Sequence, residues 1–101
     1  MNDGTADIYG GIFDSQPLVF AHLWEEAGPG YIADRVEVIS NQDPRRRLRH
    51  WFGEDDAQAI EDELGTFTTC VIVFANAGVA IGEGTDRLAY LGTFAPLRTL
   101  P

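Results

Sequence analysis

Few residues in this sequence have the chemistry of a catalytic or metal-binding site. The chain contains two histidines, His22 and His50, and one cysteine, Cys70. His22 and Glu26 are four positions apart, so on a helix they would share a face and could ligate a metal or exchange a proton. A metal site needs a third ligand, and none is spaced nearby in the sequence. We therefore interpret the pair as a histidine beside a carboxylate at a solvated helix edge, and we predict no metal and no cofactor.

The remaining reactive groups give little support to catalysis. Cys70 lies in the apolar stretch TFTTCVIVFA, which is typical of a buried thiol with no activating group beside it. Gly78, Gly82 and Gly84 are not followed by the Lys-Ser/Thr pair of a phosphate-binding loop. The sequence has no GxSxG, HExxH or CxxC motif either, and one cysteine excludes an internal disulfide. We expect a protein that is not an enzyme.

The charged residues are unevenly distributed. Sixteen acidic residues stand against seven basic ones, for a net charge of −9, and all seven basic residues are arginine. A field of this sign repels nucleic acid backbones and anionic membranes and attracts basic proteins, although net charge can also serve solubility alone. Four arginines stand together, beside His50, Trp51 and Phe52: Arg45, Arg46, Arg47 and Arg49. Such a cluster can bind nucleic acid, but the acidic total favours pairing with the acidic helix that follows.

That acidic helix, over 54–64, is the surface that we expect to bind a partner. Its carboxylates can imitate the charge of phosphates and occupy a basic active site, with Trp51 or an exposed tyrosine as an aromatic anchor. The helix dipole disfavours the three carboxylates near its C-terminal end, and no Lys or Arg offsets them. Such local conflicts are more common at functional sites than elsewhere, whereas a solvated charged face is the alternative. The predicted partner-binding residues are Trp51, Glu54, Asp55, Asp56, Glu61, Asp62 and Glu63.

The pattern of apolar residues predicts one domain over residues 1–101, with possible fraying confined to 1–5 and 96–101. Strands are expected at 7–13, 35–39, 66–75 and 86–94, and residues 79–85 form either a short strand or a glycine-rich loop. The segment 66–75 is almost wholly apolar, so it should be central and covered on both faces. The glycines of the first strand, Gly10 and Gly11, indicate close backbone approach or a bulge.

Three helices complete the pattern. The first is capped by Asp14 or Ser15 and continues to Ala27, with an expected apolar face of Leu18, Val19, Leu23 and Ala27, widened by Phe20 and Trp24. A short helix over 45–52, capped by Asp43, should bury Leu48, Trp51 and Phe52, and the acidic helix should bury Ala57, Ile60 and Leu64. The fold class is therefore α+β: a mostly antiparallel sheet with two or three helices packed on one face.

Two segments carry a resemblance to a known class of proteins. IYGGIF at 8–13, which runs into a helix, and LAYLGTF at 88–94 near the C-terminus resemble bacterial polymorphic-toxin immunity proteins, and the immunity protein 22 family looks nearest. The resemblance covers these two short motifs. It implies a small protein that binds and neutralises a cognate toxin, often a nuclease, inside the producing cell. Both motifs look structural, so the resemblance carries over no binding residue.

The sequence-based hypothesis is an immunity protein that binds a basic toxin by electrostatic steering and blocks its active site. The alternative is a non-catalytic adaptor or regulatory subunit that recruits its partner through a sheet edge or an apolar patch. A homodimer formed through sheet edges stays open. The N-terminus MNDGTADIYG has no basic or apolar signal region and no apolar run spans a bilayer, so we expect a cytoplasmic protein with no membrane partner.

Overall fold

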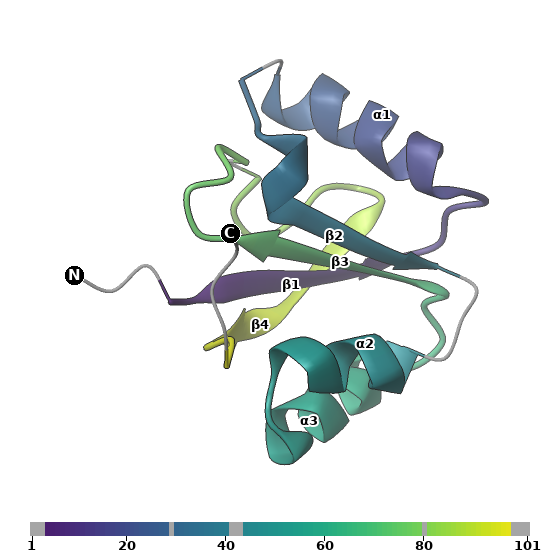
Figure 1. The fold of residues 1–101 in the computed structure, drawn as a ribbon. Helices are drawn as coiled ribbons and strands as arrows, with labels where there is room; N and C mark the ends of the chain where they lie inside the picture. Colours follow the sequence, from purple (N-terminus) through teal and green to yellow (C-terminus); the bar gives the residue numbers. More distant parts are fainter. Residues whose placement is uncertain (1–3, 29, 41–43, 80, 98–101) are drawn as a thin grey trace.

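The computed structural model describes residues 4–28, 30–40, 44–79 and 81–97. Four strands form one antiparallel sheet, and three helices pack on it, which confirms the predicted α+β class (Figure 1). None of the described helices is long and apolar enough to cross a membrane. In chain order the elements are β1 (Ala6–Gly11), α1 (Gln16–Ala27), the 3-10 turn η1 (Ala33–Arg35), β2 (Val36–Ser40), α2 (Pro44–Trp51), α3 (Glu54–Leu64), β3 (Thr69–Phe74) and β4 (Leu88–Phe94).

The sheet has the strand order β2-β3-β1-β4. β3 is antiparallel to both β1 and β2, so these two strands are parallel to each other with β3 inserted between them. The connection from β1 through α1 to β2 is thus a split βαβ unit. α2 and α3 connect β2 to its neighbour β3, and β4 returns along the free side of β1. β2 and β4 are consequently the two edge strands of this sheet.

The helices cover both faces of the sheet, so the prediction of helices on one face is wrong. In Figure 1, α1 lies on one side of the strands and the α2–α3 pair lies on the other. The reason is β3, all of whose residues are buried. Its Cys70, Ile72 and Phe74 belong to the core cluster with α2 and α3, while Val71 and Val73 belong to the cluster with α1. A strand that is apolar on both sides must be covered on both sides.

α1 buries a narrower stripe than its sequence suggested. Val19, His22 and Leu23 face the sheet, whereas Leu18 and Trp24 have exposed fractions of 45% and 56%. The prediction that Leu18 and Trp24 belong to the apolar face is therefore wrong. The buried positions follow the i, i+3, i+4 spacing of one helix face. His22 lies on this buried face, although the sequence predicted only apolar residues there.

The glycine pair of β1 permits close contact with its neighbours, as predicted. A Cβ atom on Gly11 would lie 2.5 Å from the carbonyl oxygen of Arg87, and one on Gly10 would lie 2.7 Å from the Phe67 ring. The pairing of β1 with β4 also shifts register between Ile8 and Tyr9. The missing side chains therefore let β4 and the segment before β3 approach β1 closely.

The buried residues of α2 and α3 are those that the sequence predicted, from Leu48 to Leu64. Asp43, the predicted cap of α2, lies outside the described residues, as do residues 1–3 and 98–101 in the predicted frayed ends. The described part of 79–85 is a loop with one isolated bridge from Gly84 to Ala89. This loop brings Thr85 and Asp86 toward α1.

Candidate functional site

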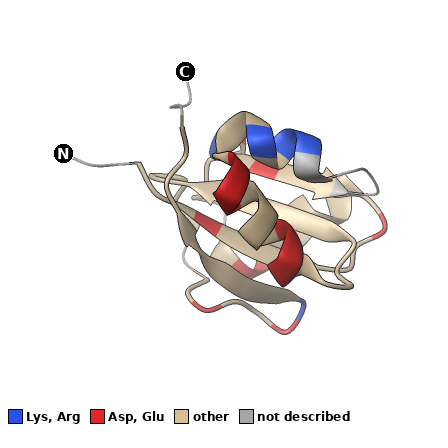
Figure 2. Ribbon diagram, turned by 90° about the horizontal axis from the view of Figure 1, so that it is seen from below, with Lys and Arg blue, Asp and Glu red and all other residues tan. Residues whose placement is uncertain are grey.

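The α2–α3 pair places basic and acidic side chains next to each other. Figure 2 shows the Lys/Arg positions on α2 beside two separate groups of Asp/Glu positions on α3. Ala57, Ile60 and Leu64 hold α3 against the sheet, so the polar positions of the helix face outward. We call the carboxylates of α3 the acidic surface: Glu54, Asp55, Asp56, Glu61, Asp62 and Glu63.

The acidic surface has two halves at opposite ends of α3. Glu54 to Asp56 form the first turn, and Glu61 to Glu63 lie near the last turn, about 10 Å further along the axis at 1.5 Å per residue. Four of the six side chains are exposed, and Asp56 and Glu61 are partly buried. The structure therefore brings all six predicted carboxylates to one helix and leaves most of them accessible to a partner.

The two halves relate to the helix dipole in opposite ways. The first-turn carboxylates stabilise the positive N-terminal end of α3, whereas the later group lies near its negative end. The last turn of α3 contains no basic residue. Each exposed charge of the wrong sign costs about 0.3–1 kcal/mol of helix stability. The conflict inferred from the sequence is thus present in the folded helix.

The arginines of α2 pair with α3 only in part. Arg49 forms an ion pair of 2.8 Å with Glu54, as predicted, but Arg47 pairs instead with Glu37 of β2 at 2.7 Å. Both pairs include an arginine with about half of its side chain exposed, so each stabilises the fold weakly. The side chain of Arg45 lies outside the described residues. Pairing with α3 is therefore not the common role of the described arginines.

Trp51 is not an aromatic anchor, and that prediction is wrong. Its exposed fraction is 7%, its indole nitrogen donates a hydrogen bond of 2.8 Å to Glu37, and its ring packs edge-on against Phe74. The cause is its spacing from Leu48, because a residue three positions further along a helix shares the buried face. Trp24 and Tyr90 are exposed aromatic residues at 56% and 39%, and both lie away from α3.

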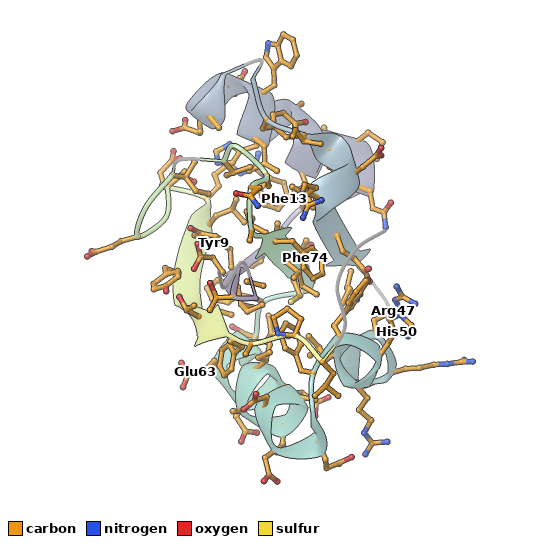
Figure 3. The ribbon with its side chains drawn as sticks, turned by 60° about the vertical axis from the view of Figure 1, so that its left-hand side comes forward. Tyr9, Phe13, Arg47, His50, Glu63 and Phe74 are labelled. Carbon is orange, nitrogen blue, oxygen red and sulfur yellow. The ribbon has the colours of Figure 1, made fainter. Side chains whose placement is uncertain are left out.

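Glu37 is a polar centre that sequence reasoning missed. Its carboxylate accepts hydrogen bonds of 2.7 and 2.9 Å from Arg47 and a third from Trp51. Partial burial is the largest effect on its pKa and raises it, but the hydrogen bonds and the charge of Arg47 together outweigh burial, so the pKa lies below its ordinary value. The available signal was the alternation of β2, which points Glu37 and the buried Ile39 to the same face. In Figure 3, Arg47 and His50 project from α2 on the side opposite Glu63.

A hollow of about 370 Å³ lies beside β2. Glu37 and Arg47 border it, and the edge strand forms its floor. Polar and apolar side chains from the first two helices and the sheet line the hollow: Gln16, Phe20, Asp34, Val36, Glu37, Val38, Ile39, Arg47 and Phe74. Gln16 already donates a hydrogen bond of 2.9 Å to the carbonyl oxygen of Val38, so part of this edge is occupied by the chain itself.

Cys70 has the environment that its sequence predicted. Its exposed fraction is 2%, and burial, followed by the charge of Glu37, raises its pKa to about 12. A thiol with such a pKa stays protonated at neutral pH, and the thiol is a poor nucleophile. His50 is exposed and lies edge-on against Trp51. Neither residue has the geometry of an activated nucleophile–base pair.

His22 is buried rather than solvated, so the prediction of a solvated helix edge is wrong. Its exposed fraction is 6%, and its Nε2 lies 2.7 Å from the hydroxyl oxygen of Thr85. No third ligand is spaced near His22 and Glu26 in the sequence. The fold supplies one, because ligand atoms of His22, Glu26 and Asp86 all lie within 4.8 Å of one another. Asp86 is far away in the sequence, so helical spacing alone gave no signal for it.

Comparison of the chain with known protein families, with curated proteins and with solved structures found no match in any of the three.

Proposed function

We propose that this protein is a non-enzymatic inhibitor that binds and neutralises a basic toxin in the manner of an immunity protein. The observation that supports the proposal is the acidic surface: six carboxylates on one helix that contains no Lys or Arg. They belong to a chain with a net charge of −9. The expected partner is a toxin domain with a basic active-site groove, such as a nuclease, and the expected place of action is the cytoplasm.

The mechanism begins with electrostatic steering. A protein surface of one sign raises the association rate of an oppositely charged partner by about 10–10³-fold, and salt weakens this effect. After the encounter, the carboxylates of α3 occupy positions that substrate phosphates would take, because arginine binds either group with the same planar geometry. Trp51 takes no part in this contact, since its side chain is buried between α2 and the sheet.

The half of the acidic surface near the C-terminal end of α3 is the part that we expect to contact the partner. Glu61, Asp62 and Glu63 oppose the helix dipole without a basic residue in their turn, so the folded protein is less stable for having them. Charges that cost stability are more common at functional surfaces than elsewhere. We therefore expect this half to face the partner.

The test begins with capture of the partner. The purified protein is immobilised, lysate of its own organism is passed over it at low salt, and bound proteins are eluted with a salt gradient. The expected result is a basic protein retained at equal stoichiometry, toxic when expressed alone and harmless when co-expressed with this chain. Retention of no basic protein, or toxicity that co-expression leaves unchanged, would refute the proposal.

Matched charge variants then test the surface. The triple variant Glu61→Gln, Asp62→Asn and Glu63→Gln removes three charges from α3. The control variant Asp14→Asn, Glu25→Gln and Asp34→Asn removes three exposed charges elsewhere. We expect the α3 variant to associate about 10-fold more slowly at low salt and to lose much of its salt dependence, with a smaller change in the control. Equal effects of the two variants would exclude α3 as the interface.

The sheet edges support a second candidate, an adaptor that recruits its partner by strand addition. Among the described strands, β2 and β4 each have a neighbour on one side only, and the hollow beside β2 offers a place for a partner side chain. Strand addition depends on backbone hydrogen bonds and side-chain pockets rather than on net charge. An adaptor complex would therefore survive high salt and the α3 charge variant, and a proline placed in the added strand of the partner would break it.

A further inference from the structure

We propose that His22, Glu26 and Asp86 form a binding site for one divalent transition-metal cation, with Zn²⁺ as the best match. One ligand atom from each residue lies within 4.8 Å of the other two. One imidazole nitrogen and two carboxylate oxygens are ligands that Zn²⁺ accepts in proteins, and three protein ligands leave a fourth position open to water. This inference is independent of the toxin-binding proposal, since the site lies under α1, across the sheet from α3.

The geometry needs only a small closure around the ion. With metal–ligand distances of about 2.0–2.2 Å, the ligand atoms of a tetrahedral site lie about 3.4 Å apart. Glu26 and Asp86 are exposed, so their side chains can rotate inward by the remaining distance. His22 belongs to the buried face of α1 and is held in place by packing. The site thus combines one fixed nitrogen with two adjustable oxygens.

The orientation of the His22 ring is fixed by a second group. Its Nε2 lies 2.7 Å from the Thr85 hydroxyl oxygen, and the Phe13 ring, labelled in Figure 3, lies 5.7 Å from it, centre to centre. Metal-binding histidines usually hydrogen-bond through the ring nitrogen that does not bind the metal. Among the described residues, Thr85 is the hydrogen-bond partner that the structure gives His22. A metal at the other nitrogen, Nδ1, requires that Nε2 carries the ring proton and donates it to the Thr85 hydroxyl oxygen, which also accepts from the backbone N–H groups of Arg87 and Leu88.

The charges around the cluster also call for a cation. Two carboxylates held this close repel each other, and Glu25 and Glu26 lie near the C-terminal end of α1, whose last turn contains no basic residue. Neither Glu26 nor Asp86 forms an ion pair with a described residue in the structure. Arg87, the neighbour of Asp86, instead lies 4.2 Å over the Phe13 ring and donates to the carbonyl oxygen of Ile12.

A bound ion would fasten α1 to the loop that joins β3 and β4. His22 and Glu26 come from the helix, and Asp86 comes from a loop containing Gly78, Gly82 and Gly84, each with positive φ. Such glycines allow the unfolded backbone many conformations, so ordering this loop costs conformational entropy. A metal ion that links the loop to α1 in the folded state would offset part of that cost. An ion that binds only the folded state stabilises it in proportion to its affinity.

The experiment uses the whole chain, prepared without a polyhistidine tag and stripped with a chelator. Zn²⁺ is titrated against it by calorimetry, and the melting temperature is measured with and without Zn²⁺. We expect one equivalent of Zn²⁺ to bind and to raise the melting temperature. The visible spectrum of the Co²⁺ form should be that of a four-coordinate site. Absence of binding, or Co²⁺ in a fully hydrated octahedral form, would overturn the proposal.

Two double variants locate the ion. Glu26→Gln with Asp86→Asn removes two ligands at exposed positions, where substitution leaves the fold intact. Glu25→Gln with Glu83→Gln makes the same change of charge at exposed neighbours on the same helix and loop. We expect the first to weaken Zn²⁺ binding by more than about 100-fold, since loss of a mere outer-shell partner already costs about 10–100-fold. The second should bind like the parent chain, and equal affinities in all three proteins would overturn the assignment.

Discussion

Replacing Glu37 by glutamine tests the polar centre between β2 and α2. The side chain keeps its shape but loses its charge and one of its two acceptor oxygens, so Arg47 and Trp51 can donate only to the single amide oxygen that remains. A hydrogen bond to a charged partner contributes about 1.5–3 kcal/mol, against about 1 kcal/mol for a neutral one. The Arg47 side chain is 45% exposed, so its share is reduced by solvent to below about 1 kcal/mol. We expect Glu37→Gln to lower the free energy of unfolding by about 1–2 kcal/mol at pH 7.

The pH dependence of that loss follows from the lowered pKa of Glu37. A carboxylate whose pKa is lower in the folded protein contributes its full stabilisation above its unfolded pKa. That stabilisation is lost as the pH falls through the folded pKa. The difference between the parent and the Glu37→Gln variant should therefore be constant from pH 7 to about 5 and should shrink steadily below about pH 4.

The assay is urea unfolding followed by tryptophan fluorescence, repeated at intervals from pH 7 to pH 3. Glu25→Gln is the matched control, because Glu25 is exposed on α1 and its replacement should change stability by less than about 0.5 kcal/mol. In a melting experiment, a loss of 1–2 kcal/mol corresponds to roughly 5–15 °C for a chain of this size. Full stability of Glu37→Gln at pH 7, or a deficit that stays the same at pH 3, would refute the reasoning.

Three further predictions concern the sheet. Gly11→Ala places a Cβ 2.5 Å from the carbonyl oxygen of Arg87 and should cost about 1–3 kcal/mol in urea unfolding; Gly30→Ala, whose Cβ would meet nothing within 4 Å, is the control, and equal stabilities of the two variants would contradict the close approach. Thr69→Val removes a buried hydroxyl that has no hydrogen-bond partner among the described residues. The free energy of unfolding should therefore increase by about 1 kcal/mol, measured as a higher melting temperature, and a lower melting temperature would contradict this prediction. Cys70 should react with iodoacetamide only through unfolding, so labelling that is as fast in water as in urea would be incompatible with a buried thiol.

Local patterns predicted most of the elements because these elements follow local rules. The stripes of α2 and α3 repeat at helical spacing and face a single core, so their buried residues were identified from the sequence. β3 is rich in β-branched residues and apolar except for Thr69, and it is fully buried in the sheet. Because both faces of β3 are apolar, helices must cover the sheet on both sides. The prediction that all helices pack on one face did not take this into account.

The failures concern contacts between residues that are distant in the sequence. Trp51 lies beside four arginines in the sequence, yet its environment is set by Glu37 and Phe74 across the fold. His22 looked solvated because Thr85 and Asp86 approach it only through the loop after β3. Helical spacing reports which residues share a face, but it does not report what the fold places against that face.

The strand order has a consequence for the chain during its synthesis. β1 is made first, but both of its neighbours, β3 and β4, lie beyond residue 68, and its pairing with β4 joins Ala6 to Phe94. β2 likewise pairs with β3. Until β3 emerges, the growing polypeptide therefore carries the apolar stripes of three helices and two strands with no ladder between them. Such sequence-distant pairings form slowly, and unpaired strands aggregate. The nascent chain is thus most vulnerable before β3 is made, and a fragment that stops short of β3 should be degraded rather than retain part of the fold.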